Sequence, residues 1–186
     1  HFVIDGMFAD KALTTKGVKV EMFSNLELEG KPVKEYVAEK VFLSDAATEA
    51  HDDLVSINLS SRHTFYIHTD KDELYFLSLN GNDGCRMFIN GERVINEWGS
   101  DSWQNGRIEY TFKAGQTYEC IVEHYNRGGQ IGLDLSFGQK SFSSPETLKK
   151  LVNADCVVVC LGHDNTTEKE NHDRTFELPD GQVEYL

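Results

Sequence analysis

The most telling stretch of this chain is Arg86-Met87-Phe88-Ile89-Asn90-Gly91-Glu92-Arg93-Val94-Ile95. The dipeptide Asn90-Gly91 separates two short runs that contain Phe, Ile and Val, residues that favour strands. Asn and Gly tolerate positive φ at both central positions of a type I′ turn. The stretch therefore predicts a β-hairpin that is closed by a two-residue loop.

Short strands with turns between them are also predicted on both sides of this hairpin. Residues 17–23 alternate apolar and polar side chains with the period of two that a half-buried strand requires. Other strands are predicted at residues 62–67, 74–79, 108–112, 117–125 and 131–137, whereas a polar, turn-rich stretch follows residue 23 and extends through Pro32. Many short strands at regular spacing indicate a mainly β fold, either an antiparallel sandwich or a barrel.

The last part of the chain, from residue 141, shows a different pattern. Residues 144–152 predict a short helix, with Ser144 as its N-cap and Pro145 at its first helical position. Residues 154–162 form a near-continuous apolar run, which is typical of a parallel strand buried on both faces. A polar loop follows, and Pro179 opens a second helix. We therefore predict an incomplete α/β segment of helix, strand and helix at residues 141–186, because a single strand has no sheet to join.

The composition excludes some classes of partner. The net charge of -13 argues against nucleic acid, whose phosphates are bound by clustered Lys and Arg. No apolar run is long enough to cross a bilayer, so a membrane partner is not expected. Neutral or cationic ligands fit this charge better, although an acidic surface also serves solubility alone.

The four cysteines of the chain do not predict a metal site or a disulfide. None of them lies in a CxxC pair, which argues against zinc. Cys156 and Cys160 lie on one predicted strand at ~3.3 Å per residue, too far apart to form a bridge. Cys85 and Cys120 could meet across strands, but buried free thiols are the preferred interpretation.

Four segments of the β region carry a resemblance to a known family. They are residues 17–23, Asn82-Asp83-Gly84-Cys85-Arg86-Met87-Phe88-Ile89-Asn90-Gly91, Val94-Ile95-Asn96-Glu97-Trp98 and Ala114-Gly115-Gln116-Thr117-Tyr118. Together they resemble the protective-antigen-type β-sandwich domain, which binds carbohydrate in several families. The resemblance implies an antiparallel β-sandwich at residues 17–140, preceded by a connecting segment at residues 1–16.

The end of the chain carries a second resemblance. The pattern V-x-x-x-G, E-x-x-DR and LP-x-x-Q is matched by Val158, Gly162, Glu170, Asp173, Arg174, Leu178, Pro179 and Gln182. It resembles part of the C-terminal α/β sandwich domain of family 3 glycoside hydrolases, the β-glucosidase family. In some of these enzymes a β-sandwich is inserted just before this strand, and the order of elements here is the same. The resemblance implies that the chain is part of a retaining β-glucosidase.

Retaining glycosidases need two carboxylates ~5–5.5 Å apart, a nucleophile and an acid/base. In family 3 the nucleophile is an Asp of a separate barrel domain, so this chain alone is expected to be inactive. The resemblance assigns the acid/base to Glu170, with Glu168 as the alternative, and Arg174 to substrate binding or to an ion pair with Asp173. Asn171-His172 replace the Gly and aromatic residue that are usual in the family. In the alternative interpretation, the charged side chains around Glu170 are solvated loop residues without a catalytic role.

Two positions of the β region are candidates for contacts with sugar. Trp103 lies in a polar loop, and an aromatic face complements the C–H face of a pyranose, whereas Trp98 follows a strand and is expected in the core. Asp83 and its neighbour Asn82 match the position where lectin-type relatives hold calcium with two adjacent Asp residues. Calcium takes six to eight oxygens and Asn82 lacks a charge, so we expect no metal or other cofactor, with calcium at this pair as the alternative. Without calcium, the turn at Asn82-Asp83 is expected to be stabilised by the hydrogen bonds of these side chains.

Three functions follow from these observations. The first is part of a β-glucosidase, whose partners are an oligosaccharide or β-glucoside substrate and the rest of the parent chain. The second is a stand-alone carbohydrate-binding module or adhesin, and the third is a structural spacer that binds no ligand. Similar enzymes are often exported, which suggests a periplasmic or extracellular location, and the cysteines neither demand nor forbid an oxidising compartment.

Overall fold

The computed structural model describes residues 7–45, 57–99 and 102–139, together with Lys149, Val152 and residues 154–156. The chain divides into two units, residues 1–139 and residues 140–186. Every strand given below belongs to the first unit. Within the described ranges, no helix has both the length and the apolar character that a membrane span requires.

The described part of the first unit consists of eleven strands, and all of their pairings are antiparallel. The strands are β1 (Met7–Phe8), β2 (Val18–Phe23), β3 (Lys34–Ala38), β4 (Phe42–Ser44), β5 (Leu59–His68), β6 (Glu73–Asn82), β7 (Gly84–Ile89), β8 (Glu92–Glu97), β9 (Gln104–Phe112), β10 (Thr117–Asn126) and β11 (Gly132–Gln139).

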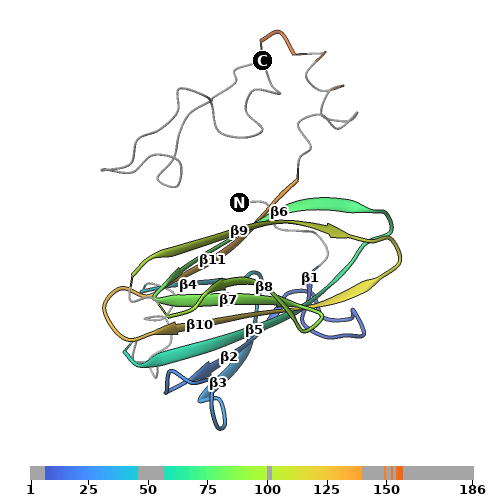
Figure 1. The fold of residues 1–186 in the computed structure, drawn as a ribbon. Helices are drawn as coiled ribbons and strands as arrows, with labels where there is room; N and C mark the ends of the chain where they lie inside the picture. The colour runs from blue at the N-terminus through green and yellow to red at the C-terminus, as the bar shows by residue number, and fades with distance from the viewer. Residues whose placement is uncertain are drawn as a thin grey trace. The chain divides into compact units, whose positions relative to one another are not determined.

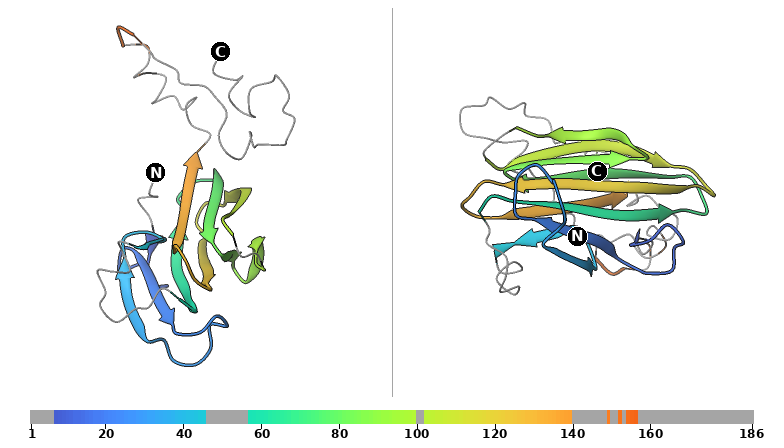
Figure 2. Two further views of the ribbon diagram at one scale, coloured as in Figure 1. Left: turned by 90° about the vertical axis from the view of Figure 1, so that its left-hand side faces the viewer. Right: turned by 90° about the horizontal axis from the view of Figure 1, so that it is seen from below.

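The strands form two sheets that lie face to face (Figure 1). The larger, seven-stranded sheet has the order β3-β2-β5-β10-β7-β8, with β1 also paired to β5. The smaller sheet has the order β4-β11-β6-β9. Figure 2 shows the strands of both sheets from the side and from below. The predicted antiparallel β-sandwich is therefore confirmed.

The hairpin at Asn90-Gly91 forms as its sequence predicts. Asn90 and Gly91 have φ angles of 51° and 81°, and Ile89 pairs with Glu92 across the turn. The backbone N–H of Asn90 donates to the carbonyl oxygen of Glu119 (2.8 Å), and the Asn90 side-chain oxygen accepts from the Glu119 N–H (2.9 Å). The turn residue therefore also attaches the hairpin to the neighbouring strand β10.

Three strands lie where the sequence pattern does not predict them. Strands β3 and β4 follow the polar, turn-rich stretch, in a region where we predicted no strand, and β1 lies within the predicted connecting segment at residues 1–16. Strand β3 is an edge strand with no buried residue, and β4 has three residues. Neither shows a regular apolar alternation, because an edge strand buries little of either face.

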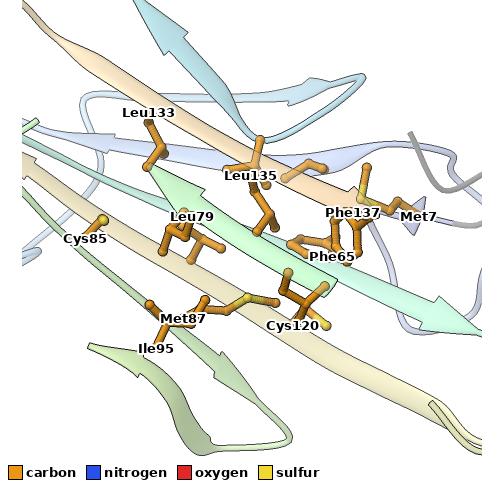
Figure 3. Close-up of a cluster of buried hydrophobic side chains, with 14 of the residues drawn as sticks. Met7, Phe65, Leu79, Cys85, Met87, Ile95, Cys120, Leu133, Leu135 and Phe137 are labelled. Atoms are coloured by element: carbon orange, nitrogen blue, oxygen red, sulfur yellow. The ribbon is translucent and has the colours of Figure 1, made fainter. Parts of the chain in front are cut away.

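The core lies between the sheets and contains side chains from both of them (Figure 3). Phe65 of β5 meets Phe137 of β11 edge to face, with ring centroids 6.2 Å apart. Tyr75 is buried next to Phe112, whereas Phe76, its neighbour in the chain, is only partly buried on the opposite face of β6. The two neighbouring aromatic residues therefore point to opposite faces of the strand.

Cys85 and Cys120 are both buried free thiols, as predicted. Cys120 pairs with Ile89 of β7, whereas Cys85 pairs with His124 of β10, so the two cysteines are four residues out of register. Burial raises the pKa of the Cys85 thiol to about 12. Both cysteines therefore serve as small core residues.

The predicted α/β segment lies mostly outside the described residues. Lys149 and Val152, within the predicted helix at residues 144–152, have helical backbone. Residues 154–156, at the start of the predicted buried strand, are exposed and belong to no strand. The helix–strand–helix arrangement of residues 141–186 therefore stays a prediction.

Candidate functional site

Two loops are joined at one end of the sandwich. The backbone N–H of Asp83, in the turn between β6 and β7, donates to the carbonyl oxygen of Tyr125 (3.0 Å). One side-chain oxygen of Asp83 accepts from the backbone N–H of Arg127 (2.9 Å), and the side-chain amide of Asn82 donates to the carbonyl oxygen of Gln130. The β6–β7 turn therefore holds the β10–β11 loop in place.

This turn is closely packed. Asn82 and Asp83 are 8% and 4% exposed, and the peptide bond between them is cis. A Cβ atom at Gly84 would collide with the ring of Tyr125, so that only glycine fits there. The side-chain hydrogen bonds that we predicted for this turn are present, but they reach a loop more than forty residues away in sequence.

Two buried histidines lie in the core, and one of them, His124, supports the same turn. His124 donates from Nε2 to the carbonyl oxygen of Asn82 (2.6 Å), and His63 Nε2 lies 3.1 Å from the Ser61 hydroxyl. Burial lowers the pKa of His124 to about 4. Burial, with a smaller contribution from His124, lowers the pKa of His63 to about 3. Both rings are therefore neutral near pH 7, so that His124 supports the turn without adding charge to it.

Trp103 lies at the same end of the sandwich. Its side chain is 55% exposed, and its six-membered ring lies against Gly132, where a Cβ atom would collide with it. Gly132 pairs with Asn82 of β6 and with Ser44 of β4, and its missing side chain would point away from the core. The structure therefore brings the predicted Trp103 and Asp83 to one end of the sandwich.

Trp98, which we expected in the core, is not among the residues of the buried core. It is half-buried between the ring of Tyr125, with centroids 4.7 Å apart, and the guanidinium of Arg86, 4.0 Å from its centroid. Arg86 also forms an ion pair with Glu123 (2.6 Å), and the other oxygen of Glu123 pairs with Arg62 (2.8 Å). Sequence patterns gave no sign of this cluster, because Glu123 lies 61 residues from Arg62 and 37 from Arg86 in the chain.

The donor atoms at the turn do not fit a resident calcium ion. Calcium takes six to eight oxygen ligands and is held mainly by carboxylates. Asp83 supplies one carboxylate, and one of its oxygens already accepts from Arg127. In the described ranges, no group of three or more His, Cys, Asp or Glu side chains is arranged to hold a metal. We therefore assign no step of recognition to a metal.

The predicted residues of the C-terminal loop cannot be placed in this geometry. Glu168, Glu170 and Arg174 lie outside the described residues, so their assignments stay predictions. The arrangement that the structure does describe is an exposed indole next to a rigid, polar pair of loops. Such an arrangement suits a ligand with a flat apolar face and hydroxyl groups around it.

Comparison with known proteins agrees with this fold. The model of the PA14 domain family matches residues 14–150. No curated protein matches the chain. Among solved structures, an anti-sigma factor domain-containing protein from Clostridium clariflavum is 20% identical, with a TM-score of 0.57, over 67% of this chain and 42% of that one.

Two further solved structures share the fold. A β-glucosidase from Kluyveromyces marxianus is 18% identical, with a TM-score of 0.59, over 72% of this chain and 18% of that one. The Epithelial Adhesin 9 A domain from Candida glabrata, solved in complex with Galβ1-4GlcNAc, is 9% identical, with a TM-score of 0.53, over 72% of this chain and 86% of that one. The chain thus spans less than half of the C. clariflavum protein and less than a fifth of the K. marxianus β-glucosidase. Because the family model covers most of the chain, and the protective-antigen-type sandwich expected from the sequence is the fold found here, the chain belongs to the PA14 domain family.

Proposed function

We propose that this PA14 domain binds neutral carbohydrate at the end of the sandwich where Trp103 and the Asn82-Asp83 turn lie. The observation that carries the proposal is Trp103, an indole that is 55% exposed and yet is held against the backbone of Gly132. A ring that is already held in place loses little freedom when a sugar stacks on it. The adhesin domain with the same fold, solved with a bound galactosyl disaccharide, supports this function.

Asp83 has a positioning role in this proposal. It is 4% exposed, which leaves little of its carboxylate for direct contact with a ligand. Its hydrogen bond to Arg127 instead fixes the loop in which Arg127 and Gln130 are exposed to solvent. Sugar hydroxyls would therefore meet the polar groups of this loop, while the indole receives the C–H face of the ring.

Calorimetric titration with neutral oligosaccharides tests the proposal. We expect Trp103→Ala to weaken binding about tenfold, which corresponds to ~1.4 kcal/mol. The matched control is Val37→Ala, which removes another exposed apolar side chain (52% exposed) from an edge strand of the larger sheet. Equal affinities of Trp103→Ala and the unchanged chain, or no binding of any sugar, would contradict the proposal.

We further propose that the domain is part of a retaining β-glucosidase of glycoside hydrolase family 3. The tail pattern that ends in Gln182 and the K. marxianus β-glucosidase, which contains a region of the same fold, support this assignment. In the parent enzyme that we propose for this chain, Glu170 is the acid/base, with Glu168 as the alternative, and Arg174 binds substrate. The sandwich would shape the substrate site next to the catalytic domains, which supply the nucleophile.

The second candidate is a stand-alone binding module or adhesin. It is favoured by the C. glabrata adhesin domain, 86% of which is covered by this chain. Calcium dependence separates the two candidates, because lectin-type relatives hold calcium at the position of Asn82 and Asp83. We expect the same sugar affinity in excess calcium and in excess chelator. Loss of binding in chelator, restored by calcium, would instead favour the adhesin.

A further inference from the structure

We infer that the outer face of the smaller sheet extends the Trp103 site into a platform for a chain of several neutral sugars. The platform consists of Trp103 and the outward side chains Phe76, Ser78, Asn80, Asn105, Asp134 and Ser136. This inference rests on the proposed carbohydrate binding, because it names the class of glycan that the same site accepts.

The register of the sheet places these side chains in rows. On β6 the buried Leu77 and Leu79 alternate with outward Phe76, Ser78 and Asn80. Ser78 pairs with Ser136 of β11, Asn80 pairs with both Asp134 and Asn105, and Phe76 pairs with Gly138. From Gly132, under Trp103, to Gly138 the strand covers about 20 Å at ~3.3 Å per residue. The platform is therefore long enough for several sugar rings in line.

Each end of the platform has an aromatic residue. Trp103 lies over Gly132 at one end. At the other end Phe76 lines an open groove of about 480 Å³ together with Ser78, Arg107, Glu109, Ser136 and the glycine at position 138. A chain that runs along the strands would thus meet one aromatic side chain near each of its ends.

The polar side chains between the aromatic residues are held in fixed positions. Asn105 donates to the Ser78 hydroxyl (3.2 Å) and to the side-chain oxygen of Asn80. Ser136 donates to Asp134 (2.8 Å). Amide and hydroxyl groups that are already ordered lose little entropy when they bind the hydroxyls of a sugar.

The chemistry of this face favours a glycan over a peptide. Strands β6 and β11, which carry most of the platform, are paired on both sides, so neither offers an open backbone edge for the addition of a peptide strand. The edges of this sheet lie at β4 and β9, at the sides of the platform and not along it. An amphipathic helix needs a continuous apolar groove, whereas a polar row separates Phe76 from Trp103 here. In the groove, Arg107 and Glu109 carry opposite charges, which favours a neutral ligand over an ion.

Chain length is the measurable consequence. We would titrate the chain by calorimetry with neutral β-linked gluco-oligosaccharides, from the disaccharide to the hexasaccharide. We expect affinity to rise about tenfold along the series. Phe76→Ala should lose most of this gain and keep its affinity for the disaccharide. The matched control is Leu74→Ala, which removes an exposed apolar side chain from the same face of β6, outside the groove.

A second variant and a spectroscopic measurement protect the test against misfolding. A Cβ atom at position 138 would lie 3.8 Å from its nearest neighbours, so a valine fits there without a clash and its side chain fills the groove. Gly138→Val should therefore also abolish the rise in affinity with chain length. Amide shifts at Phe76 and Ser136 should move with the hexasaccharide and not with the disaccharide. The inference is overturned, and the proposed function kept, if the affinity of the wild-type chain does not depend on oligosaccharide length. The same holds if the rise in affinity survives in Phe76→Ala and Gly138→Val. Failure of every sugar to bind overturns the proposed function as well.

Discussion

At the scale of single residues, the absence of a side chain at Gly132 is what allows the Trp103 indole to lie on the sheet. A Cβ atom at this position would collide with the six-membered ring of the indole. Gly132 is not among the glycines with positive φ, so its backbone also suits other residues. The glycine is therefore needed for the close approach of Trp103 and not for the conformation of the strand.

We expect Gly132→Ala to weaken sugar binding about tenfold and to leave the fold intact. The added methyl group pushes the indole out of position, and Trp103 is exposed enough to move without disturbing the core. The matched control is Gly138→Ala, on the same face of β11, where a Cβ atom has 3.8 Å of clearance. Calorimetry with a disaccharide measures both variants, and equal affinities for the two would contradict this role of Gly132.

His63 and His124 should make the stability of the fold depend on pH. Both pKa values are lowered by burial, to about 3 and about 4, from an ordinary value of 6.5. The unfolded chain therefore binds protons at a higher pH than the folded chain does. The stabilisation is complete above pH 6.5 and is lost as the pH falls toward 4, by up to ~1.4 kcal/mol per pH unit for each histidine.

Urea unfolding between pH 4 and pH 7 checks this dependence. His63→Leu should reduce the slope of the unfolding free energy with pH by about half, because one of the two protonation sites is gone. The control Ile67→Val, on the same face of β5, should lower the free energy by ~1 kcal/mol at every pH. A slope in His63→Leu that equals the wild-type slope would contradict this account.

At the scale of the strands, Glu123 of β10 joins its own strand to the two strands beside it in the larger sheet, β5 and β7. It pairs in register with Arg62 of β5 and with Arg86 of β7, and its side chain is 8% exposed. The two arginine side chains are 33% and 26% exposed. Loss of the carboxylate would leave two partly buried cations without their counter-charge, which is more costly than loss of an exposed ion pair.

We expect Glu123→Gln to lower the free energy of unfolding by about 1–3 kcal/mol, less than for a fully buried pair because both arginines reach solvent. The control Asp72→Asn removes the partner of Lys113, in a pair whose side chains are both 56% exposed, and should cause no measurable change. Urea unfolding at constant pH compares the two. Equal effects would mean that Glu123 has no special role in the sheet.

The strands show which parts of the fold follow from local sequence. The hairpin at Asn90-Gly91 was predictable because its turn needs positive φ at adjacent residues, which those two types allow. The edge strand β3 was not, because it has no buried residue that would give it an apolar alternation. The short β4 was not, since it depends on β11, a partner strand distant in sequence. For the same reason, the sequence singled out Trp103 but not Gly132, on which the indole rests.

At the scale of the whole molecule, the proposed enzyme makes a prediction about Glu170. In the parent protein, Glu170→Ala should slow hydrolysis of aryl β-glucosides with poor leaving groups far more than of those with good ones. The reason is that a general acid matters most when the leaving group needs a proton. Azide should restore turnover, because it replaces the water that the general base would activate.

Glu168→Ala is the matched control for this experiment, two positions away in the same loop. If Glu168→Ala, and not Glu170→Ala, shows the dependence on leaving group and the rescue by azide, Glu168 is the acid/base. If neither variant differs from the wild-type enzyme, the loop does not carry the acid/base. The sandwich would then be a binding domain without a catalytic neighbour in this segment.

The different surroundings of the two tryptophans give the chain a built-in optical probe. Trp98 is half-buried between Arg86 and Tyr125, whereas Trp103 is 55% exposed. A dissolved quencher such as iodide should therefore dim the emission of Trp103 first and leave that of Trp98 as an internal reference. A ligand stacked on Trp103 would shield it from the quencher, so that occupancy of the site can be followed by fluorescence without a label.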